Sequence, residues 1–188
     1  MKKIAIFASG SGSNAENIAH YFKEHKYIKV ALILSNKPDA YVLKRAEKLG
    51  IPSLVFNRDD LYRDNKVKKT LLNHGVDFIV LAGFLWLVPS WLIRMYPNRI
   101  VNIHPALLPK YGGKGMYGER VHRQVYENGE KESGITIHYI NERYDEGQII
   151  HQARFSIKPD DGPEEIAQKA HALEYQEYPR VIEKLLNE

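Results

Sequence analysis

Cysteine is absent from this chain of 188 residues, and the absence excludes several kinds of site. Without thiols the protein has no disulfide, no thiolate metal site and no cysteine nucleophile. Long apolar runs are missing as well, because the longest, residues 78–88, contains Gly83 and falls short of the ~18 residues that span a bilayer. The apolar stretch after Lys2 and Lys3 is too short for a secretory signal. We therefore expect a cytoplasmic protein without membrane contact.

Charge of one sign is scarce too. The 27 basic and 23 acidic residues are interleaved, so the net charge of +4 forms no basic stripe of the kind that binds nucleic acid. A small anionic substrate would suit this mild excess of positive charge. The length and the hydrophobic share of 44% predict one globular domain over residues 1–188.

Strand-like and helix-like segments alternate along the first half of the chain. Apolar strands are predicted over residues 3–7, 28–34, 53–56, 78–81 and 100–103, and amphipathic helices over residues 14–25, 41–49 and 61–73. Continuous apolar strands are typical of parallel strands buried on both faces. Repeated strand–helix–strand units indicate an α/β fold with a doubly wound, mostly parallel, Rossmann-like sheet.

The pattern changes in the second half. Residues 135–140 and 148–156 predict an antiparallel hairpin around the polar segment 141–147. A final helix follows Asp161 as its cap, with Pro163 in the first turn. Before the hairpin, four glycines in residues 111–118 predict either an inert surface loop or a mobile flap over a binding site.

The strand predicted at residues 100–103 carries two polar residues among its apolar ones. Asn102 and His104 alternate with Val101 and Ile103, so both point to one side at the carboxyl end of the strand. Open α/β sheets hold their ligands at that end. An amide donor beside an imidazole suits a reaction that builds negative charge on a carbonyl oxygen. The alternative is that Asn102 caps a turn and His104 bonds to backbone.

The turn after the first strand reads Ser9-Gly10-Ser11-Gly12-Ser13-Asn14. Its glycines allow close approach of the backbone, and the N–H groups that open the next helix form an anion site. The spacing also fits a dinucleotide-binding pattern, but that pattern needs an acid after the second strand, where the chain has Ser35-Asn36-Lys37. The turn therefore favours a lone phosphate, and the alternative is a merely tight turn.

Asp145 lies at the tip of the predicted hairpin. Alone it would be a surface turn residue, but a carboxylate beside His104 would favour the imidazolium and raise its pKa. For His138, on the incoming strand, core packing is an equally good interpretation. The other histidines lack paired spacing for a metal, so we expect no metal site.

Four motifs share the order and spacing of one enzyme family. They are the Ser-Gly-x-Gly-Ser-Asn turn, Leu81-Ala82-Gly83-Phe84, the run Asn102-Ile103-His104-Pro105-Ala106-Leu107-Leu108-Pro109, and Asp145-x-Gly147. To about Leu186, the chain resembles the folate-dependent phosphoribosylglycinamide formyltransferase family. The third motif is shared by all formyltransferases that use 10-formyltetrahydrofolate, and the serine-rich turn is particular to the branch that acts on glycinamide ribonucleotide.

The resemblance implies a reaction. A formyl group would pass from the co-substrate 10-formyltetrahydrofolate to the amine of glycinamide ribonucleotide in de novo purine biosynthesis, without a metal. Asn102, His104 and Asp145 would be the catalytic residues. Asn102 and protonated His104 would stabilise a tetrahedral intermediate, which agrees with the missing cysteine nucleophile.

The resemblance also implies binding residues. Gly12, Ser13 and Asn14 would hold the substrate phosphate, and Glu174 would contact the substrate on its amine side. The folate would be bound by Arg58, Leu85, Trp86, Leu87, Val88 and Asn102. Trp86 departs from the family pattern, in which a basic residue is common at this position.

Other functions stay open on the sequence. One alternative is a formyltetrahydrofolate deformylase, which usually carries an N-terminal regulatory domain. Another is a methionyl-tRNA formyltransferase, which needs a tRNA-binding domain for which 188 residues leave no room. A non-catalytic phosphate- or nucleotide-binding module would give Asn102, His104 and Asp145 no reason to converge. We expect small molecules as the only ligands, no nucleic acid partner, and a monomer or homodimer.

Overall fold

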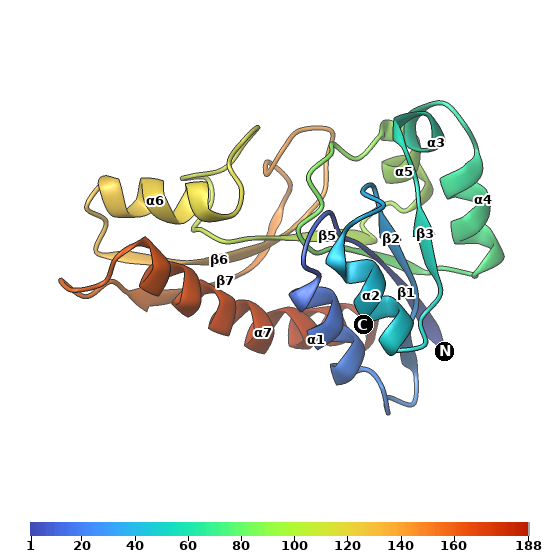
Figure 1. Cartoon of the computed structure of the whole chain (residues 1–188), viewed down its shortest axis with the longest axis horizontal. Helices are drawn as coiled ribbons and strands as arrows, with labels where there is room; N and C mark the ends of the chain where they lie inside the picture. The colour runs from blue at the N-terminus through green and yellow to red at the C-terminus, as the bar shows by residue number, and fades with distance from the viewer. Residues whose placement is uncertain (188) are drawn as a thin grey trace.

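The computed structural model describes residues 1–187, which contain one seven-stranded sheet and seven helices (Figure 1). The strands lie in the order β3-β2-β1-β4-β5-β6-β7. Their bounds are β1 Lys2–Phe7, β2 Ile28–Ser35, β3 Ser53–Val55, β4 Phe78–Leu81, β5 Ile100–His104, β6 Glu132–Tyr139 and β7 Ile149–Ser156. β1 to β5 pair with one another in parallel, as the continuous apolar runs predict.

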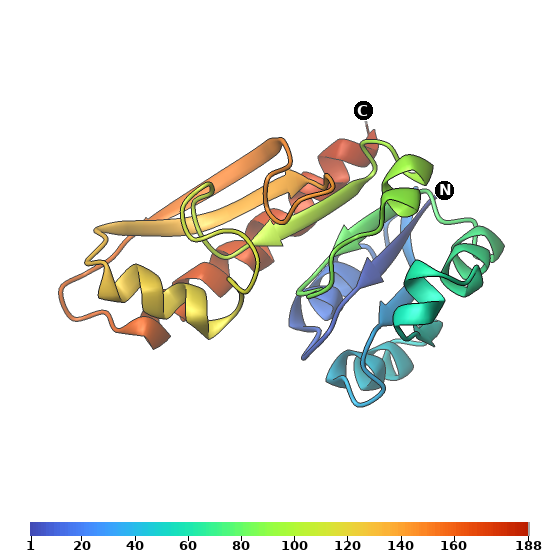
Figure 2. The same cartoon turned by 90° about the horizontal axis from the view of Figure 1, so that it is seen from above.

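The antiparallel part of the sheet begins at β5. This strand pairs in parallel with β4 and antiparallel with β6, which forms the predicted hairpin with β7. In Figure 2 the hairpin extends away from the N-terminal half of the sheet. The predicted fold class, a doubly wound and mostly parallel sheet followed by a hairpin and a final helix, is confirmed.

The helices depart from prediction in several places. Their bounds are α1 Ser13–Tyr21, α2 Tyr41–Lys48, α3 Arg58–Tyr62, α4 Lys66–Asn73, α5 Ser90–Met95, α6 Glu119–Glu127 and α7 Pro163–Asn187. The single helix predicted over residues 61–73 is wrong: α3 starts earlier, from a capping box at Asn57, and ends before α4 begins. The short helix α5 was not predicted. α1 ends at Tyr21 rather than at residue 25, because His25 accepts bonds from the backbone N–H groups of Tyr27 and Ile28 and so belongs to the turn into β2.

Both faces of the parallel sheet are buried. Along β1, Ile4 and Ile6 belong to one apolar cluster, whereas Ala5 and Phe7 belong to another on the opposite face. The first cluster includes Tyr178 of α7, whose hydroxyl lies within bonding distance of carbonyls on two neighbouring strands: Leu81 of β4 at 2.9 Å and Val101 of β5 at 3.2 Å.

The last helix does not begin with the predicted cap. The carboxylate of Asp161 accepts a bond from the backbone N–H of Lys158 at 2.7 Å and also pairs with the Lys169 ammonium, so it serves the preceding turn. The first bond of the helix runs from the N–H of Ile166 to the carbonyl of Gly162. α7 then packs on α1, α6, β6 and β7. Among residues 1–187 no helix has an apolar stretch long enough to cross a membrane.

Candidate active site

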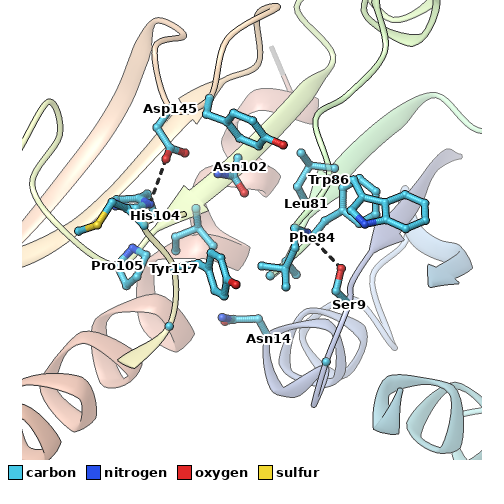
Figure 3. A pocket seen from close by; sticks show the side chains of 18 of the residues that line it. Ser9, Asn14, Leu81, Phe84, Trp86, Asn102, His104, Pro105, Tyr117 and Asp145 are labelled. Atoms are coloured by element: carbon cyan, nitrogen blue, oxygen red, sulfur yellow. Dashed lines mark hydrogen bonds and ion pairs between the residues drawn. The ribbon is translucent and has the colours of Figure 1, made fainter. Parts of the chain in front are cut away.

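A cavity of about 670 Å³ opens at the carboxyl ends of β1, β4 and β5 (Figure 3). Its size is typical of a site for a small molecule or cofactor. The strand order reverses between β1 and β4, and open α/β sheets bind their ligands at such a point. The walls come from residues 9–14, 81–88, 102–105, 113–119 and 140–145, with further residues from α6 and α7.

His104, the last residue of β5, is buried at the end of the cavity. Its Nε2 lies 2.7 Å from the carbonyl oxygen of Tyr111, and its Nδ1 lies 3.6 Å from Oδ2 of Asp145 (Figure 3). A carbonyl oxygen only accepts hydrogen bonds, so the proton of the neutral ring is on Nε2. The nitrogen that faces Asp145 is therefore the one that can take up a proton.

Asp145 reaches His104 from the loop between β6 and β7. Its backbone is in the left-handed region, with φ at 57°, and its Oδ2 accepts a bond from the N–H of Gly113 at 2.9 Å. Two residues later the loop passes so close to β6 that a Cβ on Gly147 would fall on the carbonyl oxygen of Tyr139. The glycine of the Asp145-x-Gly147 motif is thus needed for the tight return that places the carboxylate in the cavity.

His138 is a site residue whose role the sequence left undecided. It lies opposite Asn102 in the pairing of β5 with β6. Its Nδ1 donates to the carbonyl of Tyr139 at 2.8 Å, so its Nε2 accepts a bond from the Asn102 amide at 3.2 Å. The same Nε2 lies 3.6 Å from Oδ1 of Asp145. His138 is buried, as core packing predicts, but it also joins Asn102 to Asp145 in one polar network.

Burial governs the charge of this network. It lowers the pKa of His104 below the usual histidine value, although Asp145 and the Tyr111 carbonyl act in the opposite direction. Asp145 does raise the pKa of His104, as expected, but burial outweighs this contribution, so the net shift is downward and the free site holds a neutral imidazole at pH 7. Burial would raise the pKa of Asp145, but the His138 side chain, His104 when its ring is protonated, and the Gly113 N–H together outweigh it, so the pKa is lowered and Asp145 is ionised.

The turn into α1 forms another wall of the cavity. Gly12 is the N-cap of α1, with φ at 74°, and a Cβ there would collide with Val42 of α2. Ser13 and Asn14 follow as the first helical residues, where N–H groups have no partner within the helix. The Gly12, Ser13 and Asn14 backbone thus offers donors and the positive end of a helix dipole to an anion in the cavity.

Asn14 also connects the turn to the last helix. Its amide donates to Oε2 of Glu174 at 2.8 Å, and the same carboxylate oxygen lies 3.0 Å from Nδ1 of His171. The bond to Glu174 raises the pKa of His171 despite partial burial. Among the described residues, the buried Oδ1 of Asn14 and the buried Nδ1 of His122 have no protein partner. Glu174 lies where the sequence places it, whereas His122 and His171 were not predicted to line the cavity.

The remaining wall is largely apolar and aromatic. Leu85, Trp86, Leu87 and Val88 all line the cavity. The N–H of Leu85 donates to the hydroxyl of Ser9 at 3.0 Å, and this hydroxyl donates to Oδ1 of Asn36 at 2.6 Å (Figure 3). Ser9 therefore ties this segment to the ends of β1 and β2, a contact that no sequence pattern indicated.

Among the described residues 1–187, Arg58 does not line the cavity. Its guanidinium lies over the ring of Trp86, 4.7 Å from the centroid, so it touches the site through that side chain. Among the same residues, no group of three or more His, Asp or Glu side chains is arranged to hold a metal ion.

Comparison with known proteins agrees with this architecture. A model of the formyl transferase family matches residues 2–182. The chain is 39% identical to phosphoribosylglycinamide formyltransferase of Bacillus subtilis, over 99% of this chain and 95% of that protein. It is 40% identical to the chloroplastic enzyme of the same name from Arabidopsis thaliana, and spans 66% of that relative's own length. The crystal structure of phosphoribosylglycinamide formyltransferase from Bacillus halodurans is similar with a TM-score of 0.88, at 38% identity, over 100% of this chain and 96% of that one.

Proposed function

Because the chain belongs to the formyl transferase family, we propose that it transfers a formyl group from 10-formyltetrahydrofolate to the amine of phosphoribosylglycinamide, in purine biosynthesis. One observation carries the proposal. A single cavity joins a helix N-terminus suited to a phosphate with the network of Asn102, His104 and Asp145, suited to acyl transfer.

The two substrates would enter from different walls. The ribonucleotide phosphate binds at Gly12, Ser13 and Asn14, and Glu174 contacts the same substrate nearer its amine. The folate lies along residues 85–88, with its ring between apolar side chains and backbone groups, and its acidic tail near Arg58. This orientation brings the formyl group to Asn102 and His104, where the two substrates meet.

The chemistry follows from the protonation states of the site. The amine nitrogen attacks the formyl carbon, and the electrons of the C=O bond move onto oxygen. One N–H of the Asn102 amide is bonded to His138, and the other donates to this oxyanion, a contribution typically worth ~3 kcal/mol. The attacking nitrogen, now positively charged, loses its proton to Nδ1 of neutral His104.

The resulting imidazolium completes the reaction. Ionised Asp145, 3.6 Å from Nδ1, stabilises the positive charge of the imidazolium. The positive charge of His104 in turn stabilises the negative charge of the tetrahedral intermediate. The intermediate collapses as the bond from carbon to N10 of the folate breaks. N10 then takes up the proton held between His104 and Asp145, and the starting state, neutral His104 beside ionised Asp145, is restored.

A direct assay tests the proposal. The purified protein is supplied with 10-formyltetrahydrofolate and phosphoribosylglycinamide, and in parallel reactions with water alone or with charged initiator tRNA as acceptor. We expect formylation of the ribonucleotide to be much the fastest reaction. Hydrolysis of the folate at an equal or greater rate would instead make the protein a deformylase.

The substrate-binding residues need a separate measurement. Asn14→Ala removes an amide at the phosphate turn and should raise the KM for the ribonucleotide roughly tenfold, while kcat and the KM for folate change little. As part of the same proposal, the protein binds only small-molecule substrates, acts in the cytoplasm, and is a monomer or a homodimer.

A further inference from the structure

Tyr111 has an unusual backbone and a mechanistically important contact. Its φ is 57°, in the left-handed region that bulky side chains rarely adopt. Its carbonyl oxygen accepts the bond from Nε2 of His104 at 2.7 Å. A backbone conformation of this kind persists only where the surroundings hold it. The surroundings of Tyr111 therefore affect the orientation of the carbonyl that His104 contacts.

The side chain of Tyr111 is held at its far end. Its hydroxyl donates to Oε1 of Glu130 at 2.7 Å and accepts a bond from the amide of Asn128 at 2.9 Å. Both partners belong to the turn between α6 and β6, on the other side of the loop from the cavity. Glu130 is also bound by the ammonium of Lys110 at 2.9 Å. We call Tyr111, Asn128 and Glu130 the Tyr111 clamp.

We propose that the Tyr111 clamp is a positioning device: through the Tyr111 carbonyl it holds His104 in the Nε2–H tautomer, which leaves Nδ1 to exchange the proton beside Asp145. A neutral imidazole carries one proton, and the bond made by one nitrogen decides the role of the other. If the carbonyl moved away, the competing tautomer would place the proton on Nδ1, facing the Asp145 carboxylate. His104 could then take no proton at the reacting centre.

The geometry around Nδ1 explains why the tautomer matters. In the Nε2–H form, Nδ1 and Oδ2 of Asp145 are both acceptors, 3.6 Å apart. An incoming proton is therefore attracted to the space between them and is shared by both groups. The Gly113 N–H donates to the same Oδ2 from the loop backbone and so holds the carboxylate in place beside Nδ1. The Tyr111 clamp therefore keeps Nδ1 of His104 unprotonated until the substrate delivers the proton.

Other titratable groups lie near His104, and the test must separate their effects. Asp145 and His138 face it from the hairpin, Glu174 from α7 and His122 from α6. The Tyr111 carbonyl raises the pKa of His104, because it accepts a stronger bond from the charged ring than from the neutral one. Loosening the clamp should therefore lower the pKa of His104 further, with the four facing groups unchanged.

The experiment reads the tautomer directly by ¹⁵N NMR of His104 at a pH above its pKa. The signal is assigned by its loss in His104→Ala. We expect Nε2–H in the unaltered protein, and a mixture with Nδ1–H in Tyr111→Phe and in Glu130→Ala. Lys110→Gln is the matched control, because it removes a contact of the same Glu130 carboxylate without touching the Tyr111 hydroxyl, and it should keep the Nε2–H form.

Kinetics provide the second readout, and this part rests on the proposed function. Tyr111→Phe should lower kcat roughly tenfold, leave both KM values within about twofold, and move the acid limb of kcat to lower pH. A purely structural role would instead lower the thermal unfolding midpoint and leave the acid limb in place. Glu130→Ala keeps the test open if Tyr111→Phe does not fold.

The outcomes distinguish the two proposals. An Nε2–H tautomer that persists in both clamp variants, or a predominant Nδ1–H form in the unaltered protein, overturns the clamp. Failure to formylate the ribonucleotide, with a tautomer that still depends on Tyr111 and Glu130, overturns the proposed function and leaves the clamp standing.

Discussion

The two ends of the cavity are built on different principles. At the catalytic end, four polar side chains lie close together: Asn102 is bonded to His138, and Asp145 lies 3.6 Å from the rings of both His104 and His138. At the aromatic end, the ring of Trp86 packs against Phe56 and Phe84 at centroid distances of 6.1 and 6.4 Å.

This difference explains which residue changes the site can accept. A buried polar network fails when one member is removed, because its partners are left without hydrogen bonds. An apolar wall needs shape and volume rather than particular atoms, and its polar links use backbone groups: the N–H of Leu85 donates to Ser9, and the carbonyl of Leu87 accepts from Tyr62. Such a wall can therefore accept Trp86 where the family resemblance leads one to expect a basic residue, whereas no equivalent replacement is expected at His104.

The largest effect should come from breaking the catalytic network. His104→Ala and Asp145→Asn should each lower kcat by roughly a hundredfold to ten-thousandfold, because the proton acceptor or its counter-charge is lost. The KM for the ribonucleotide should change little. The double variant should be hardly worse than His104→Ala, since Asp145 acts through His104. Steady-state kinetics of the three proteins decide this, and losses that add on a logarithmic scale would show that the pair is not a unit.

The aromatic end should respond more weakly and should accept a substitute. Trp86→Ala removes ring surface from the wall and should raise the KM for folate roughly tenfold. Trp86→Phe should restore most of that loss, because another ring fills the space. Titration of a folate analogue by fluorescence or calorimetry provides the measurement. If Trp86→Phe were as poor as Trp86→Ala, the indole would make a specific contact that an apolar wall does not explain.

The pH dependence should distinguish the two ends. The proposed mechanism needs neutral His104, so kcat should fall as the pH drops through the pKa of this residue, which burial places below 6.5. In Asp145→Asn the residual kcat should have its acid limb at still lower pH, because the carboxylate that favours the charged ring is gone. Binding of a folate analogue to the aromatic end should stay flat across the same range. If the acid limb of kcat moved to higher pH in Asp145→Asn, Asp145 would not be the group that favours protonated His104.

The smallest effect should come from the link between Ser9 and the cavity wall formed by residues 85–88. Ser9→Ala leaves the N–H of Leu85 and Oδ1 of Asn36 without this partner and should raise the KM for folate about threefold to tenfold. The neighbouring Ser11→Ala is the matched control and should change folate binding little. An unchanged KM in Ser9→Ala would mean that the wall holds its shape without the hydroxyl.

The sequence predicted the parts of the site that depend on local pattern. The alternation of Asn102 and His104 with apolar neighbours defines their shared face, and the glycines of the first turn mark the helix N-terminus. What it could not predict depends on register and burial. His138 becomes a site residue only because the hairpin pairs it with Asn102. The net direction of the His104 pKa shift could not be predicted, because the raising effect of Asp145 could be inferred from the chain, whereas the extent of burial that outweighs it could not.

The bond between Asn14 and Glu174 joins residues 160 positions apart, and this separation has a consequence for how activity arises during synthesis. A ribosome synthesises the chain from its first residue onward, so the turn at residues 9–14 emerges long before α7, which carries Glu174. Contacts between distant positions also form late, since a long loop must close first. Nascent chains stalled before residue 174 should therefore leave the first turn without its partner, and substrate binding should begin only when the final helix docks.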